Sequence, residues 1–198
     1  SRSGGGAEPL LLPPADHLTM VAVEADYCPT CGTALRSRVF EGRERRYCPD
    51  CEQFVWRNPV PTAGVAVRDD DAVLLVRREG GPSEGYWTLP GGYLEPDEPA
   101  PVAAVRELRE EAGVDADTEA LRLLGTHLRE HSGEAYYREQ HVLLVRYVVD
   151  REHVDGEPSA GSDADETEFF ATDDLPTPMR PHNCKFAERA LAREEPGR

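Results

Sequence analysis

The residues between Gly92 and Val114 carry much of the chemistry in this sequence, because three carboxylates recur there at helical spacing. If the stretch is helical, each residue turns by about 100°, which places Glu107, Glu110 and Glu111 on one face. Apolar residues then fall on the opposite face. Carboxylates gathered on a rigid element are ligands that Mg²⁺ prefers, with water and substrate phosphate filling its remaining positions. The alternative from spacing alone is a solvated helix with a glutamate-rich face.

The ends of this helix are marked by prolines and glycines. Pro99 and Pro101 are tolerated only in a first turn, where no intrahelical hydrogen bond is lost. Gly113 stands where a left-handed residue would close the last turn. Gly91 and Gly92, upstream of the helix, allow a tight turn and a close approach of the backbone to a ligand.

The whole stretch runs Gly92, five residues, Glu98, seven residues, and then the nonapeptide RELREEAGV. This pattern resembles, without a mismatch, the signature of the Nudix hydrolases. The resemblance implies an α+β fold, the α/β/α sandwich in which a mixed sheet lies between helices. It also implies hydrolysis of a nucleoside diphosphate linked to another moiety, which releases a nucleoside monophosphate.

The resemblance further implies roles for the residues of the signature. Mg²⁺ or Mn²⁺ would be bound by Glu107, Glu110 and Glu111, with the Gly91 carbonyl as a further ligand. Two further residues would have supporting roles. Arg106 would orient Glu107, and Glu98 would pair with Arg106 and hold it in place. Family members differ over the general base. It is either a signature glutamate, here Glu107, which we favour, or a glutamate of a later loop, for which the candidates are Glu130, Glu134 and Glu139.

A second constellation precedes the signature and consists of two CxxC pairs, Cys28 with Cys31 and Cys48 with Cys51. Four thiolates at this spacing are typical of a zinc ribbon, in which a closed tetrahedral site has a structural role. The metal would stabilise a module too small to do so by burial. Disulfides or a redox dithiol are the disfavoured alternatives, and Cys184 is left as a free thiol.

Composition limits the partners. The 198 residues carry a net charge of −16 and contain one lysine, Lys185. Such an acidic chain disfavours nucleic acid as a partner, since phosphate contacts draw on Lys and Arg. The six arginines of residues 27–57 keep a weak phosphate-contact alternative open. No apolar run is long enough for a membrane span, so we expect a cytoplasmic protein.

We therefore expect a flexible tail at 1–26, a zinc ribbon at 27–57 and a Nudix domain at 58–198. Within the last, the expected elements are strands at 60–68, 72–77, 120–130, 136–149 and 167–171, a loop at 151–168 and a helix at 182–195. A homodimer is common in the family but is not dictated by this sequence.

The substrate is the least determined property. The chain resembles ribbon-containing members that act on ADP-ribose or FAD, through Asn58-Pro59 and the run WTLPGGYLE. It lacks the downstream motif of NADH pyrophosphatases. A small nucleotide substrate of the ADP-ribose or FAD type is the prediction. The alternatives are NAD(H) or NAD-capped RNA hydrolysis, and a non-catalytic nucleotide sensor whose ribbon binds nucleic acid.

Overall fold

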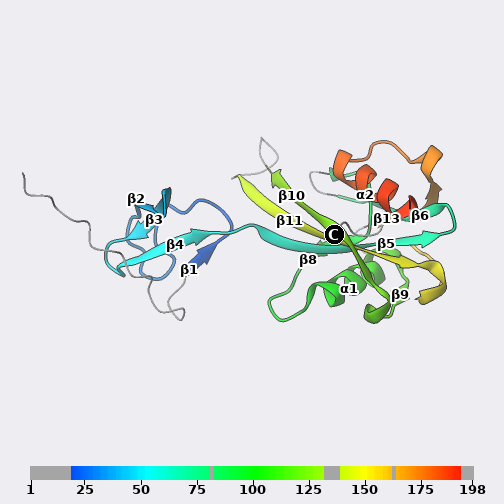
Figure 1. Cartoon of the computed structure of the whole chain (residues 1–198), viewed down its shortest axis with the longest axis horizontal. Helices are drawn as coiled ribbons and strands as arrows, with labels where there is room; N and C mark the ends of the chain where they lie inside the picture. The colour runs from blue at the N-terminus through cyan, green and yellow to red at the C-terminus, as the bar shows by residue number, and fades with distance from the viewer. Residues whose placement is uncertain (1–18, 81–82, 132–138, 162–163, 193–198) are drawn as a thin grey trace, which may run out of the picture. The chain divides into compact units, whose positions relative to one another are not determined.

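The computed structural model describes residues 19–80, 83–131, 139–161 and 164–192 (Figure 1). The chain divides into two compact units, Ser1–Asn58 and Pro59–Arg198. No helix in the described ranges is long and apolar enough to cross a membrane.

The N-terminal unit is a four-stranded sheet with the spatial order β1-β4-β3-β2. Its strands are β1 (Thr19–Val21), β2 (Arg36–Phe40), β3 (Arg43–Cys48) and β4 (Gln53–Arg57). β2 and β3 form a hairpin, and aromatic rings cover one face of the sheet. The ring centroid of Phe54 lies 5.0 Å from that of Phe40 and 5.2 Å from that of Tyr47.

β1 differs from the tail that the sequence predicts for residues 1–26. Residues 1–18 lie outside the described ranges, but from Thr19 the chain pairs in parallel with β4. The side-chain amide of Gln53 donates to the Thr19 hydroxyl over 3.1 Å. β1 is ordered because it satisfies backbone groups that an open edge of β4 would leave unpaired. A three-residue strand of this kind has no distinct sequence pattern.

The C-terminal unit is built on a seven-stranded mixed sheet. Its main path is β10-β11-β5-β6-β13, while β7 pairs with β6 and β8 pairs with β5. The strands are β5 (Val60–Asp69), β6 (Ala72–Arg78), β7 (Trp87–Thr88), β8 (Gly91–Tyr93), β10 (Arg122–His131), β11 (Gln140–Asp150) and β13 (Ala164–Ala171). β11 runs parallel to β5, and the other pairs in this sheet are antiparallel.

Helices cover both faces of this sheet (Figure 1). α1 (Ala100–Ala112) packs on one face, where Ala104 and Leu108 meet Val65 of β5 in a buried core. α2 (Pro181–Leu191) packs on the other, where Phe186 meets Ala66 of β5 in a second core. The sandwich of a mixed sheet between helices, predicted from the sequence, is confirmed.

α1 begins and ends where its sequence predicts. Pro99 is the N-cap residue, and Gly113 takes the left-handed conformation with φ of 68°. The Gly113 N–H donates to the Arg109 carbonyl over 3.1 Å, which closes the helix.

The segment after β11 corrects the loop predicted for residues 151–168. It contains the 3-10 helix η4 (Arg151–His153), the short strand β12 (Val154–Asp155), which pairs with β9 (Asp115–Ala116), and the start of β13 at Ala164. The 3-10 helices η3 (Thr118–Ala120) and η5 (Thr172–Asp174) complete the unit. The N–H groups of Ser159 and Gly161 donate to the carbonyls of Ala112 and Glu111 over 2.9 and 3.1 Å. The segment is ordered because it satisfies carbonyls at the C-terminus of α1.

Candidate active site

α1 sets the glutamates of the signature at different depths. Glu111 is buried, with 4% of its surface exposed. The side chain of Glu107 is 13% exposed, and that of Glu110 is 50% exposed. The Glu111 carboxylate accepts a hydrogen bond from the Gly91 N–H over 2.9 Å and lies 3.7 Å from the Arg78 guanidinium. β8 and α1 are thereby joined at the site.

Arg106 holds several of these carboxylates together. Its guanidinium lies 2.6 Å from Glu98, 2.7 Å from Glu107 and 3.0 Å from Glu110. It also donates to the Tyr93 carbonyl over 3.0 Å. The hydrogen bond from Arg106 holds the pKa of Glu98 below its usual range, and the same bond raises the pKa of Arg106. The structure thus brings Glu98, Arg106 and Glu107 into one hydrogen-bonded group.

Gly92 makes room for the Glu107 carboxylate. A Cβ atom added at Gly92 would lie 2.3 Å from Oε1 of Glu107. Burial raises the pKa of Glu107, while the hydrogen bond from Arg106 acts in the opposite direction. A carboxylate with a raised pKa is a better proton acceptor than an exposed one.

The structure does not gather Glu107, Glu110 and Glu111 as closely as their spacing suggests. Among the described residues, one group of three or more His, Cys, Asp or Glu side chains has all its ligand atoms within 4.8 Å of one another. That group is the four cysteines of the N-terminal unit and not these glutamates. Arg106 contacts Glu107 and Glu110, whereas Glu111 lies near Arg78. The oxygen donors still fit a hard divalent cation, which prefers carboxylates.

A cavity of about 410 Å³ lies beside these residues. Its lining includes Glu107 and Glu111 but not Glu110. Gly91 lines the same cavity. Of the alternative general bases, Glu130 and Glu139 are absent from the described lining, and Glu134 lies outside the described residues.

The cavity also contains an arginine cluster that the sequence analysis missed. It consists of Arg78 from β6, Arg129 from β10, Arg146 from β11 and Arg180, the N-cap residue of α2. Burial and the charge of Arg129 lower the pKa of Arg146 to about 10, which leaves it protonated at neutral pH. Burial and Arg129 also lower the pKa of His182, another lining residue, to about 3. One signal was available, since Arg146 interrupts the apolar run HVLLVRYVV.

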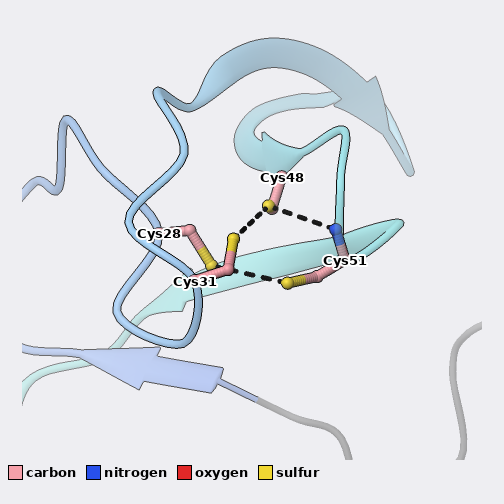
Figure 2. Close-up of side chains that lie close together, drawn as sticks. All are labelled: Cys28, Cys31, Cys48 and Cys51. Carbon is pink, nitrogen blue, oxygen red and sulfur yellow. Dashed lines mark hydrogen bonds between the residues drawn. The ribbon is translucent and has the colours of Figure 1, made fainter.

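The four cysteines of the N-terminal unit converge as their spacing predicts. Their Sγ atoms lie within 4.8 Å of one another and point toward a common centre (Figure 2). The Sγ atoms of Cys31 and Cys48 are 3.5 Å apart, and those of Cys28 and Cys51 are 4.0 Å apart. Sulfur atoms at the corners of a tetrahedral zinc site are separated by about 3.8 Å, so the donor set fits Zn²⁺. Hydrogen bonds with Thr33 lower the pKa of Cys31 to about 6, whereas burial raises the pKa of Cys48 and the hydrogen bond with Cys31 raises that of Cys51.

Comparison with known proteins defines the family. Residues 58–190 match the NUDIX domain, and the chain belongs to the Nudix family, as its signature predicts. It is 32% identical over 122 residues to an ADP-ribose pyrophosphatase of Methanocaldococcus jannaschii, covering 62% of this chain and 68% of that protein. It is 36% identical over 89 residues to the NAD-capped RNA hydrolase NudC of Stutzerimonas stutzeri, covering 45% of this chain but only 31% of that protein.

Solved structures agree in fold. A MutT NUDIX hydrolase from Burkholderia pseudomallei is 29% identical with a TM-score of 0.57, over 67% of this chain and 98% of that one. The NUDIX domain of NrtR from Shewanella oneidensis, in complex with ADP ribose, has a TM-score of 0.58 over 74% of this chain and 93% of that one. At 20% identity this second likeness concerns the fold alone.

Proposed function

We propose that this chain is a Mg²⁺- or Mn²⁺-dependent hydrolase that cleaves the diphosphate bond of an ADP-ribose-like or FAD-like nucleotide. The observation that carries the proposal is the cavity into which α1 presents Glu107 and Glu111 and which the arginine cluster also lines. Carboxylates suit the metal, and guanidinium groups suit the phosphates. The likeness to the ADP-ribose pyrophosphatase of M. jannaschii supports the same substrate class.

In the proposed reaction, water attacks one phosphorus of the diphosphate. A new P–O bond forms, the bridging P–O bond breaks, and the products are a nucleoside monophosphate and a phosphorylated partner. Glu107 accepts the proton of the attacking water, and its raised pKa suits that role. When bound by Glu107, Glu110 and Glu111, with the Gly91 carbonyl, the divalent cation would supply Lewis-acid stabilisation of the phosphates.

The residues around Glu107 position it. Arg106 holds the Glu107 carboxylate, and Glu98 holds Arg106 in turn. In the ribbon, proposed for residues 27–57, Cys28, Cys31, Cys48 and Cys51 would bind Zn²⁺ with no open position, which is a structural role. The proposed hydrolase domain is 58–198.

NAD-capped RNA or NAD(H) is the second candidate substrate. It is favoured by the 36% identity with NudC, although that likeness covers 89 residues. The two candidates share the diphosphate linkage and differ in the group beyond it.

The test is a product analysis by chromatography and mass spectrometry. Purified protein with Mg²⁺ is incubated with ADP-ribose, FAD, NADH, NAD⁺ and an NAD-capped RNA oligonucleotide. We expect AMP and a phosphorylated partner from ADP-ribose or FAD. Cleavage of the capped RNA alone would transfer the assignment to the second candidate.

Glu111→Gln is the matched inactive variant. It keeps the shape of the side chain and an oxygen to accept the Gly91 N–H, but it removes the charge. We expect the rate to fall by roughly 100-fold or more, since even loss of a residue that supports a ligand costs about 10- to 100-fold. Glu119→Gln, an exposed change in η3, is the control and should retain the wild-type rate. Nucleotide binding without turnover in the wild type would instead favour a sensor.

A further inference from the structure

Arg146 differs from Arg68, another buried arginine of the same sheet. Arg68 of β5 is 7% exposed and Arg146 of β11 is 5% exposed. Arg68 donates to Asp150 through Nε over 2.8 Å and to the Ala190 carbonyl through Nη1 over 2.9 Å. Its charge is therefore neutralised within the protein.

The charge of Arg146 is not neutralised in this way. Its one hydrogen bond within the described residues is a long one, 3.4 Å, from Nη1 to the carbonyl of its neighbour Val145. Its Nε has no partner among the described residues, and none of their carboxylates lies within 4.0 Å of its guanidinium. The carboxylates of Glu111 and Glu107 favour its charged form from a greater distance. A buried guanidinium with so few hydrogen bonds is nonetheless destabilising in general, and a ligand in the cavity can supply the missing ones.

The fold makes a slot for this guanidinium. Arg146 lies opposite Gly64 in the parallel pair of β11 and β5. A Cβ atom at Gly64 would lie 2.9 Å from Nη1 of Arg146 and 2.4 Å from the Pro90 carbonyl oxygen. Arg146 also lines the cavity that Glu107 and Glu111 line. The guanidinium is thus buried against the sheet and still reaches the cavity.

Asn183 of α2, which also lines the cavity, carries a second unsatisfied group. It is 5% exposed, and its Nδ2 donates to the Thr88 hydroxyl over 2.8 Å. Its Oδ1 is buried and accepts no hydrogen bond from the described residues. A buried donor of positive charge and a buried acceptor together match a ligand that carries both a phosphate and a hydroxyl group.

We propose that Arg146 and Asn183 form a subsite for a ribose 5-phosphate group of the substrate. Arg146 pairs with the phosphate oxygens, and Asn183 accepts a hydrogen bond from a ribose hydroxyl. The proposal rests on the proposed function and specifies the chemical group that this part of the cavity recognises. An ADP-ribose-like substrate carries this group on both sides of its diphosphate, so the AMP half and the other half are both sources.

The test compares Arg146→Met with Arg68→Met in thermal unfolding of the full chain, in zinc-containing buffer without Mg²⁺. The probes are ribose 5-phosphate, AMP, ribose and inorganic phosphate. We expect wild-type protein to be stabilised by ribose 5-phosphate or AMP and not by ribose. Arg146→Met should melt roughly 3 °C higher than wild type without ligand and lose the ligand-induced shift, because it removes a buried charge that no carboxylate of the described residues contacts directly. Arg68→Met should melt lower than wild type.

Asn183→Ala gives an independent measurement. It should reduce the shift caused by ribose 5-phosphate to that caused by inorganic phosphate. If AMP raises the melting temperature and ribose 5-phosphate does not, the subsite belongs to the AMP half. If both raise it, the ribose 5-phosphate group is sufficient for binding.

Two results would overturn the proposal. One is a ligand-free Arg146→Met that melts as low as Arg68→Met or does not fold, because Arg146 would then be structural. The other is a ligand-induced shift that survives in Arg146→Met. Because no probe is hydrolysed in this assay, the subsite can stand even if the substrate panel shows no turnover. If the substrate panel is hydrolysed but Arg146→Met binds ribose 5-phosphate and AMP as wild type does, the hydrolase assignment holds and the subsite is wrong.

Discussion

Ion pairs hold single side chains of this site in place. Arg106 contacts Glu98, Glu107 and Glu110, so one guanidinium faces three carboxylates. Glu98 is kept ionised by this contact, and it accepts a further hydrogen bond from the Glu95 N–H over 2.9 Å. Arg106 is therefore fixed from one side and can orient Glu107 on the other.

His182 gives a prediction for the pH dependence of stability. Its Nε2 lies 3.4 Å from Nη1 of Arg129, and its ring stacks on that of His127. Burial and the Arg129 charge lower its pKa from 6.5 to about 3. The unfolded chain binds a proton at this histidine as the pH falls below 6.5, whereas the folded protein does not until about pH 3. The free energy of unfolding should therefore fall as the pH falls through this window.

We expect His182→Gln to remove this contribution. In urea unfolding at about pH 7.5 and about pH 5, wild-type protein should lose more stability than His182→Gln does. His153→Gln, an exposed histidine in η4, should behave as wild type. Equal losses in all three proteins would mean that His182 titrates normally.

At the scale of elements, the site depends on the close contact of β8 with its neighbours. A Cβ at Gly91 would lie 2.5 Å from the Ala63 carbonyl oxygen, and one at Gly92 would meet the Glu107 carboxylate. The two glycines thus let β8 lie between β5 and α1, which places the Gly91 N–H against Glu111.

Gly92→Ala should therefore impair catalysis more than folding. The Glu107 carboxylate is the far end of a flexible side chain and can move aside, so the fold should survive. We expect the hydrolysis rate to fall by roughly 100-fold, as a displacement of about 1 Å does in general. Gly80→Ala is a suitable control, because nothing lies within 4 Å of a Cβ built there. Steady-state kinetics with a wild-type rate for Gly92→Ala would show that Glu107 tolerates the displacement.

These elements also show what the sequence could predict. α1 was predictable to its ends, because Pro99 and Gly113 act locally on the backbone. The arginine cluster was not, because Arg78, Arg129 and Arg146 come from separate strands that only the register of the sheet brings together. The ordered segment around Ser159 was missed because its partners are carbonyls of α1, far away in the sequence. The local effects of proline and glycine on the backbone could be predicted from the sequence, whereas contacts between residues far apart in the chain could not.

At the scale of the whole molecule, the two units are stabilised by different means. The C-terminal unit has a buried core on each face of its sheet. The N-terminal unit has a small aromatic cluster and four cysteines whose Sγ atoms lie within 4.8 Å of one another. A unit of this size would gain much of its stability from the zinc that we propose for this site.

Cys48→Ser should accordingly act on one unit. We expect loss of zinc in native mass spectrometry and an earlier unfolding transition of residues 19–58, with the transition of the C-terminal unit unchanged. Cys184→Ser, a free cysteine in α2, should retain zinc. Zinc retained at wild-type stoichiometry in Cys48→Ser would argue against the four-cysteine site.

The origin of the cavity lining has a consequence for evolution. Glu107 and Glu111 belong to one helix, and changes there affect the core as well as the carboxylates. The arginine cluster comes from four separate elements, so a codon change there alters a side chain outside the helix that carries the glutamates. Descendants of such a gene can diversify in the nucleotides they accept, one mutation at a time, while inheriting the hydrolytic centre intact.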